Sequence, residues 1–223
     1  MNNNYKKINT NKKKLIRLFP YINNKNNIHE LKIDNESIHY ISIREVAEII
    51  TKLIIKHVHS INIINMNDIT ITDATAGVGG NTISFCKHFN NVNAIELHSK
   101  RFEYLSNNIK VYDLNNISLY NNSCLKILGN IKQDIVFIDP PWGGKYYKNH
   151  DKLLLTISDV PIESIINNLL NNSITKYPPK LIVLKIPKNY DLLYFYDNIF
   201  SNKIYLHSLK KMFILIIENN NII

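Results

Sequence analysis

The stretch Ile69-Thr-Ile-Thr-Asp73-Ala-Thr-Ala-Gly77-Val-Gly79-Gly80-Asn81 decides the fold, because an apolar run ends in an acid and a glycine-rich turn follows. This order predicts a strand over 69–74, a sharp turn that approaches a ligand closely, and a helix over 80–89. Dinucleotide-binding folds have a glycine directly after the strand, where the backbone binds a pyrophosphate. Here the strand ends in Asp73, whose negative charge would instead attract a cation. That position suits the amino group of the methionine part of S-adenosylmethionine.

Short apolar runs and helical patterns alternate on both sides of this loop. Upstream, Ser42-Ile-Arg-Glu45 has the spacing of a capping box and predicts a helix that runs to about Lys56. Downstream, the patterns predict strands over 92–96, 117–120, 134–139 and 181–184, a helix over 99–112, a helix capped by Asp159 with Pro161 in its first turn, and a closing hairpin of 204–209 and 212–217. This alternation predicts an α/β fold with a parallel sheet and right-handed crossovers.

The composition favours a protein that meets polyanions. The chain has 223 residues, and 27 basic against 18 acidic residues give a net charge of +9, which favours nucleic acid or a nucleotide as partner. Its two cysteines cannot build a disulfide framework or a four-thiolate zinc site, and no metal-ligand spacing is evident. We find no signal peptide or membrane span, and expect a monomeric intracellular protein, either cytoplasmic or nuclear.

The chain shows no linker rich in proline, glycine or serine between two halves. Residues 1–17 carry basic side chains and no acidic one, which indicates an arm that stays in solvent or lies over phosphates. We therefore expect a basic N-terminal arm and helical extension over residues 1–40, followed by a single catalytic domain over residues 41–223.

A second group of candidate cofactor residues lies at the ends of the next strands. Glu96 ends the second strand, where a carboxylate accepts both ribose hydroxyls of a bound nucleoside. Ser123 follows the third strand, where it would face the adenine. The predicted cofactor-binding residues are Asp73, Thr75, Gly77, Gly79, Asn81, Glu96, Ser123 and Asp139.

The stretch Asp139-Pro140-Pro141-Trp142-Gly143-Gly144 follows the fourth strand, where open parallel sheets bind ligands. The lone pair of a purine amine is delocalised into the ring, so its methylation needs acceptors that hold the N–H bonds. The Asp139 side chain and the Pro140 carbonyl are the candidate acceptors. Trp142 is the candidate stacking ring, with extra cation–π energy for a positively charged base. Lys188 and Asn189, after the fifth strand, are candidate phosphate ligands.

These motifs resemble trimethylguanosine synthase, the family of cap hypermethylases. Gly77-Val-Gly-Gly-Asn81 resembles its cofactor loop, Pro140-Pro-Trp-Gly-Gly144 its substrate motif, Pro187-Lys-Asn189 its Pro-Arg-Asn, and Arg17-Leu-Phe-Pro20 an upstream segment. The resemblance implies a class I S-adenosylmethionine-dependent, Rossmann-like fold with a mostly parallel seven-stranded sheet. It also implies methylation of the exocyclic N2 of 7-methylguanosine in capped RNA. It assigns substrate binding to Phe19, Pro141, Trp142, Gly143, Lys188 and Asn189, and catalysis to Asp139, Pro140 and Trp142.

The chain departs from the family pattern at three positions. Asp139 stands where the family has serine, so the acceptor beside N2 would be anionic. Where the family has Gly-Asp-Phe, this chain has Asn122-Ser-Cys124, so the acidic residue that usually contacts adenine is missing. Glu96 replaces the family's aspartate and keeps the role of binding the ribose. Two alternatives stay open: an adenine or cytosine amino-methyltransferase acting on DNA or RNA, which also uses Asp-Pro-Pro and an aromatic residue, and a catalytically silent RNA-binding module of the same fold.

Overall fold

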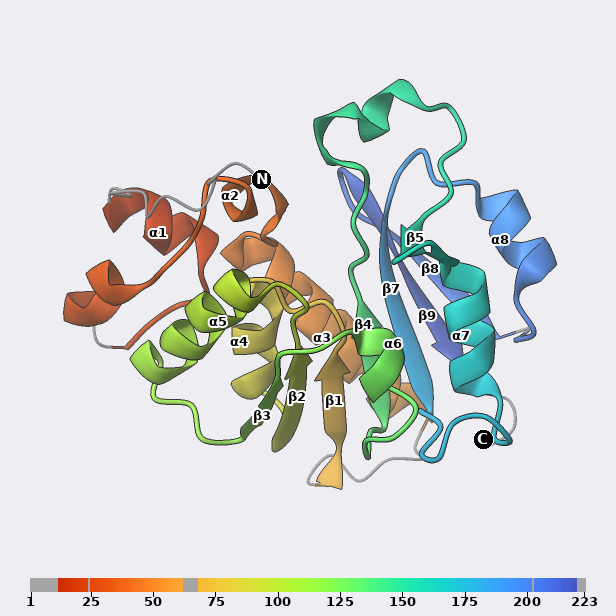
Figure 1. Ribbon diagram of the computed structural model, residues 1–223, viewed down its shortest axis with the longest axis horizontal. Helices are drawn as coiled ribbons and strands as arrows, with labels where there is room; N and C mark the ends of the chain where they lie inside the picture. Colours follow the sequence, from red (N-terminus) through yellow and green to blue (C-terminus); the bar gives the residue numbers. More distant parts are fainter. Residues whose placement is uncertain (1–11, 24, 62–67, 202, 220–223) are drawn as a thin grey trace. The chain divides into compact units, whose positions relative to one another are not determined.

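A computed structural model of the chain describes residues 12–23, 25–61, 68–201 and 203–219 (Figure 1). The chain forms two compact units, the first ending at Cys124 and the second beginning at Leu125. In both units, short strands alternate with helices, as the sequence pattern predicts.

The first unit is built on three parallel strands in the order β3-β2-β1. These are β1 (Thr70–Asp73), β2 (Asn91–Ile95) and β3 (Ile117–Tyr120), which lie side by side in Figure 1. Every residue of β1 is buried. The helices that follow are α4 (Gly80–Cys86) and α5 (Ser99–Val111), and α3 (Arg44–Ile61) precedes β1. The predicted strands and helices of this half are confirmed, and no predicted end differs from the observed one by more than five residues.

The N-terminal segment packs into this first unit. It contains α1 (Lys12–Leu18), η1 (Lys25–Glu30) and α2 (Ser37–Tyr40). Leu15, Leu18 and Phe19 are buried in one hydrophobic cluster with residues of α4 and α5. Of residues 12–17, which were predicted to lie in a solvent-exposed arm, Leu15 is buried, because an amphipathic helix forms there, and the other five are exposed. Residues 1–11 lie outside the described residues, and the boundary at residue 40 stays a prediction.

One buried amide joins the N-terminal segment to the glycine-rich loop. Asn108 of α5 is fully buried, and its Nδ2 donates to the carbonyl oxygens of Lys32 and Val78, each at 2.9 Å. Its Oδ1 accepts from the backbone N–H of Lys32 at 2.8 Å. A buried amide that satisfies both backbone segments fixes their distance, since leaving any of these groups unpaired is costly.

The second unit holds four strands in the order β4-β7-β9-β8. They are β4 (Ile135–Ile138), β7 (Leu181–Pro187), β8 (Ile204–Ser208) and β9 (Met212–Glu218). The β4 and β7 strands are parallel, whereas β9 runs antiparallel to both β7 and β8. The closing hairpin is thus confirmed. The other elements of the second unit are η3 (Gly144–Asn149), β5 (Thr156–Ile157), β6 (Val160–Pro161), α7 (Ile162–Leu170) and α8 (Leu192–Asn198). Helix α6 (Cys124–Ile127) starts at the unit boundary.

Two predicted helix caps are wrong. Helix α3 begins at Arg44, so Ser42 lies too early to cap it, and its buried Oγ has no hydrogen-bond partner among the described residues. Asp159 adopts a φ of 64° and lies in the chain between β5 and β6, while Pro161 is the residue that precedes α7. A short hairpin before α7, which the sequence analysis did not predict, accounts for the second error.

We expect Gly80→Ala to destabilise the protein, although alanine favours helices. A Cβ at Gly80 would lie 2.6 Å from Cγ1 of Ile41 and 3.0 Å from the Ser42 carbonyl oxygen. Overpacking of this kind costs about 1–3 kcal/mol, which corresponds to a melting temperature lower by roughly 2–10 °C. Thermal unfolding followed by circular dichroism measures it. Gly129→Ala is the matched control, since a Cβ there meets no atom within 4 Å; equal melting temperatures for both variants would contradict the packing argument.

Candidate functional site

The glycine-rich loop between β1 and α4 is held by the acid at its start. Asp73 is 1% exposed; its Oδ2 accepts from the Thr82 hydroxyl at 2.6 Å and its Oδ1 from the Thr75 N–H at 3.3 Å. Gly77 and Gly79 adopt φ values of 56° and 102°, which side chains rarely tolerate. Asp73 therefore shapes the loop, and its contact with a cofactor amino group stays a prediction.

Glu96 joins the same loop to the end of β2. Its Oε2 accepts from the Gly77 N–H and its Oε1 from the His98 N–H, both at 2.8 Å. Burial raises the pKa of the Glu96 carboxyl above its ordinary value, and the two amides offset part of that rise. Each carboxylate oxygen keeps a second lone pair, so the side chain can still accept a hydroxyl group. The structure thus brings two predicted cofactor residues, Gly77 and Glu96, into direct contact.

The remaining predicted cofactor residues of the first unit lie around this loop. Asn81 is 7% exposed, and its Oδ1 has no hydrogen-bond partner among the described residues. Ser123 is half-buried, and its N–H donates to Asn122 Oδ1 at 2.8 Å. A buried amide oxygen that lacks a donor, beside backbone opened by left-handed glycines, fits a ligand that carries N–H groups. These residues therefore fit S-adenosylmethionine, with Asn81 and Glu96 as the polar groups that would hold it.

The motif after β4 contains an ion pair that the sequence analysis missed. Lys185 Nζ lies 2.5 Å from Asp139 Oδ2, and the two side chains are 5% and 16% exposed. The sequence carried one signal: the apolar run of β7 is interrupted at Lys185. Its meaning depends on the register, in which Ile138 pairs with Leu184, so that the next residues, Asp139 and Lys185, also lie side by side.

Trp142 lies within the same cluster. The Lys185 ammonium lies over its ring, 5.1 Å from the centroid, and the Tyr147 ring packs edge-on with centroids 5.3 Å apart. Burial raises the pKa of the Asp139 carboxyl, while Lys185 and then the Trp142 N–H oppose that rise. Nε1 of Trp142 is buried and makes no hydrogen bond of regular geometry within the described chain. Pro140 is buried, whereas Pro141 and Gly143 are exposed.

A basic cavity of about 280 Å³ lies in the second unit. Three lysines, one tyrosine and one asparagine line it: Tyr147, Lys148, Lys188, Asn189 and Lys211. Nζ of Lys188 donates to Ser208 Oγ and lies 3.9 Å from the centre of the Phe213 ring. Nδ2 of Asn189 donates to the carbonyl oxygens of Tyr147 and His150, which fixes η3. The cavity thus unites the predicted Lys188 and Asn189 with Lys148 and Lys211, which were not predicted as site residues.

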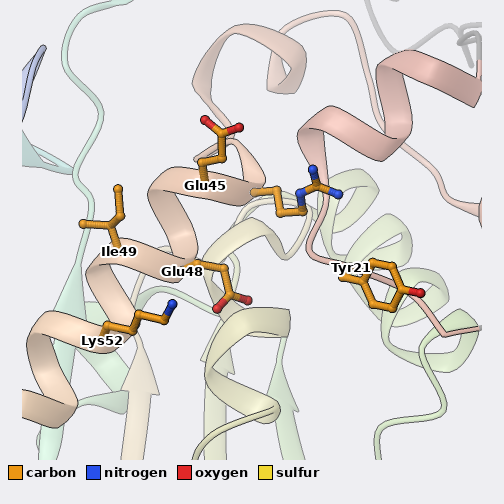
Figure 2. Close-up of a pocket in the computed structure, with 6 residues that line it drawn as sticks. Tyr21, Glu45, Glu48, Ile49 and Lys52 are labelled. Atoms are coloured by element: carbon orange, nitrogen blue, oxygen red, sulfur yellow. The ribbon is translucent and has the colours of Figure 1, made fainter.

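Phe19 and the larger cavity on α3 lie apart from the other predicted site residues of their unit. Phe19 is 1% exposed in the hydrophobic cluster of the first unit, so its burial gives it a packing role, and its contact with substrate stays a prediction. A cavity of about 640 Å³ on α3 is lined by side chains of both charge signs (Figure 2): Tyr21, Arg44, Glu45, Glu48, Ile49 and Lys52. It contains none of the predicted site residues.

The described residues contain no group of three or more histidine, cysteine, aspartate or glutamate side chains placed to hold a metal ion. Within the same part of the chain, no helix is both long and apolar enough to span a membrane.

Comparisons with known proteins support a methyltransferase. The chain is 36% identical over 219 residues to an uncharacterized protein of Acanthamoeba polyphaga mimivirus, covering 90% of this chain and 84% of that protein. It is 33% identical over 128 residues to trimethylguanosine synthase of Saccharomyces cerevisiae, covering 55% of this chain but only 39% of that enzyme.

Similar solved structures confirm the class I methyltransferase-like fold. A precorrin-6y C5,15-methyltransferase from Geobacter metallireducens has a TM-score of 0.53 at 16% identity, covering 80% of this chain and 91% of that one. A methyltransferase-like protein from Porphyromonas gingivalis W83 has a TM-score of 0.58 at 14% identity, covering 85% and 44%.

The family model for RNA cap guanine-N2 methyltransferases matches residues 69–222, which contain the glycine-rich loop, Glu96, the Asp139–Trp142 motif and the basic cavity. Its methyl donor is S-adenosylmethionine, in agreement with the fit of the loop residues. The chain is a methyltransferase and belongs to the RNA cap guanine-N2 methyltransferase family.

Proposed function

We propose that this enzyme methylates the exocyclic N2 of 7-methylguanosine in RNA 5′ caps, giving 2,7-dimethyl- or 2,2,7-trimethylguanosine. The observation that supports this most is the cluster of Asp139 and Trp142. A hydrogen-bond acceptor beside an aromatic ring suits a base that must be stacked and held by its amine at the same time. The family match supports the same substrate.

The residues after β4 have a positioning task in this reaction. S-adenosylmethionine supplies an electrophilic methyl group on a sulfonium. The Asp139 carboxylate and the Pro140 carbonyl accept the N–H bonds of the amine, which directs its nitrogen lone pair away from the base plane. As the nitrogen–carbon bond forms, the carbon–sulfur bond of the donor would break with its electron pair going to sulfur, which leaves as a neutral thioether, and the nitrogen would lose one proton to Asp139 or water. Electrons and protons balance without a metal ion.

Trp142 supplies the preference for a base already methylated at N7. Methylation at N7 makes the guanine ring cationic, and a cation is attracted to the face of an indole ring beyond ordinary stacking. An unmethylated guanine lacks this term. We therefore expect the enzyme to prefer a cap that is already methylated at N7.

The basic cavity of the second unit suits the phosphates of the cap. Lys148, Lys188 and Lys211 bring three positive charges to a space that also contains the Asn189 amide. Polyphosphate neutralised by lysines releases counterions, so binding of a cap with its triphosphate should weaken steeply with salt. Free 7-methylguanosine, which has no phosphates, should show little salt dependence.

The proposal is tested by methyl transfer from labelled S-adenosylmethionine to three substrates side by side: a 7-methylguanosine cap dinucleotide, its counterpart without the 7-methyl group, and an adenine-containing oligonucleotide. We expect label only on the 7-methylated cap. Label only on the oligonucleotide would refute the proposal. Digestion of the product and chromatography then show whether one or two methyl groups are added at N2.

One observation favours an alternative substrate. Asp139 precedes Pro140-Pro-Trp, and an acid at this place is typical of enzymes that methylate the amino group of adenine or cytosine in DNA or RNA. The oligonucleotide in the assay above decides between the two substrates. Transfer of label to none of the three substrates would refute the cap and the oligonucleotide as substrates alike.

A further inference from the structure

Two aspartate–lysine pairs mark the two ends of the parallel strands β4 and β7. Lys180 Nζ lies 3.1 Å from Asp134 Oδ1, just before the strands begin, and Lys185 Nζ lies 2.5 Å from Asp139 Oδ2 near their other end. The chemistry of the two pairs is the same. The first lysine side chain is 29% exposed, whereas the second is 5% exposed.

Because the Lys185–Asp139 pair is buried, it contributes little net free energy to the stability of the fold. Removing an ammonium and a carboxylate from water costs several kcal/mol per ion, and the attraction between them often repays no more than this cost. Lys185 also follows the wholly apolar run Leu181–Leu184. An apolar side chain in its place would continue the buried strand, so packing alone does not account for a lysine here.

The Lys185 ammonium contacts two groups that the proposed reaction uses. It pairs with the Asp139 carboxylate and lies over the Trp142 ring, 5.1 Å from the centroid. A planar ring has two faces, and Lys185 lies over one of them, so a stacked base must approach the other. The ammonium thereby fixes the acceptor and the stacking surface relative to each other.

We propose that Lys185 is a positioning residue that locks the Asp139 carboxylate and the Trp142 ring in one arrangement for the amine and the base. This inference rests on the proposed function. In this proposal Lys185 acts on the reaction through its two neighbours, Asp139 and Trp142. Reaction rates are sensitive to such placement, since a misplacement of about 1 Å costs roughly 10²-fold.

The test compares Lys185→Met with Lys180→Met. Methionine keeps a long apolar side chain and removes the ammonium in both variants. For Lys185→Met we expect kcat on the 7-methylated cap to fall by roughly 10²-fold, with a smaller change in KM. For Lys180→Met we expect both constants to stay within about twofold, because a partly exposed pair contributes little. A Lys185→Met enzyme with wild-type kcat would overturn the proposal.

Trp142 provides a readout that does not depend on activity, since it is the only tryptophan of the chain. We expect Lys185→Met to change its fluorescence emission and to increase quenching by acrylamide, and Lys180→Met to change neither. Unchanged fluorescence in Lys185→Met would show that the ammonium does not hold the ring. If the wild-type enzyme transfers no label to the cap, the proposed function fails, and the fluorescence result still decides whether Lys185 positions Trp142.

A double-mutant cycle separates positioning from general damage. In an Asp139→Asn background, the additional Lys185→Met change should lower kcat by less than about threefold, because the carboxylate that it positions is gone. Fully multiplicative losses would contradict action through Asp139. Should Lys185→Met alone unfold, the double variant leaves no charge buried without a partner and is compared with Asp139→Asn by fluorescence. Identical emission of those two proteins would overturn the proposal.

Discussion

Replacing Trp142 by alanine should weaken binding of a 7-methylguanosine cap analogue by about 10- to 100-fold. Stacking of one base on an aromatic ring contributes roughly 1–3 kcal/mol, and each 1.4 kcal/mol is a factor of ten in affinity. The loss is expected near the upper end because the ring also interacts with the charge of the 7-methylated base. Titration calorimetry measures the affinity without relying on the fluorescence of the ring that has been removed.

Trp142→Phe is the control for this change, since it keeps an aromatic face and should lose less affinity than alanine. The ratio of affinities for 7-methylated and unmethylated caps should fall toward one in Trp142→Ala. If the alanine variant binds the cap within twofold of the wild type, the base stacks elsewhere, and Trp142 serves to pack Tyr147 and Lys185.

Glu96→Gln should lower the affinity for S-adenosylmethionine by about 10- to 100-fold. The carboxylate accepts from two backbone N–H groups, those of Gly77 and His98. Glutamine has one acceptor oxygen, and its NH₂ group would face a second N–H donor, which leaves a buried donor unpaired at a cost of about 1–3 kcal/mol. The proposed bond to the ribose hydroxyls is weakened as well. Equilibrium dialysis with labelled S-adenosylmethionine measures the change.

The same carboxyl predicts the direction of a pH effect. Its pKa is raised by burial, so it takes up a proton at a higher pH than an ordinary glutamate. The accepting form is present above that pKa, and cofactor affinity should therefore fall as the pH drops through it. Glu96→Gln should lose this dependence, whereas Glu96→Asp should keep it. A wild-type affinity that stays constant down to the ordinary range of glutamate titration would argue against this role.

The strand ends and the turn of the proposed cofactor site could largely be predicted, because the sequence features that indicate them are local. A strand that ends in an acid, two glycines that need left-handed backbone, and an acid at the next strand end can each be read from a short window. The structure brings Glu96 into contact with Gly77, while their binding of a cofactor stays a prediction. It also shows hydrogen bonds within the loop that the sequence does not reveal, such as the one that Asp73 accepts from the Thr82 hydroxyl.

In the proposed substrate site, the Asp139–Trp142 motif could be predicted from the sequence, but the residues that contact and position it could not. Lys185 becomes meaningful only through the β4–β7 register, which joins residues far apart in the chain. The role of Lys211 depends on the hairpin that brings it to the cavity containing Lys188. Asn189 was predicted as a phosphate ligand, which stays a prediction; the structure adds that its amide supports the backbone of η3.

The buried Asn108 has a consequence for how far the chain can be shortened. Its single amide bonds with Lys32 on one side and with Val78, inside the glycine-rich loop, on the other. An enzyme trimmed to residues 41–223 would lose Lys32 and leave that amide half-satisfied beneath the loop. Where the loop binds the cofactor as proposed, we expect ordering of the N-terminal segment and cofactor affinity to be thermodynamically linked, so that each strengthens the other. The helical extension thus supports, through Asn108, the loop that we propose binds the cofactor.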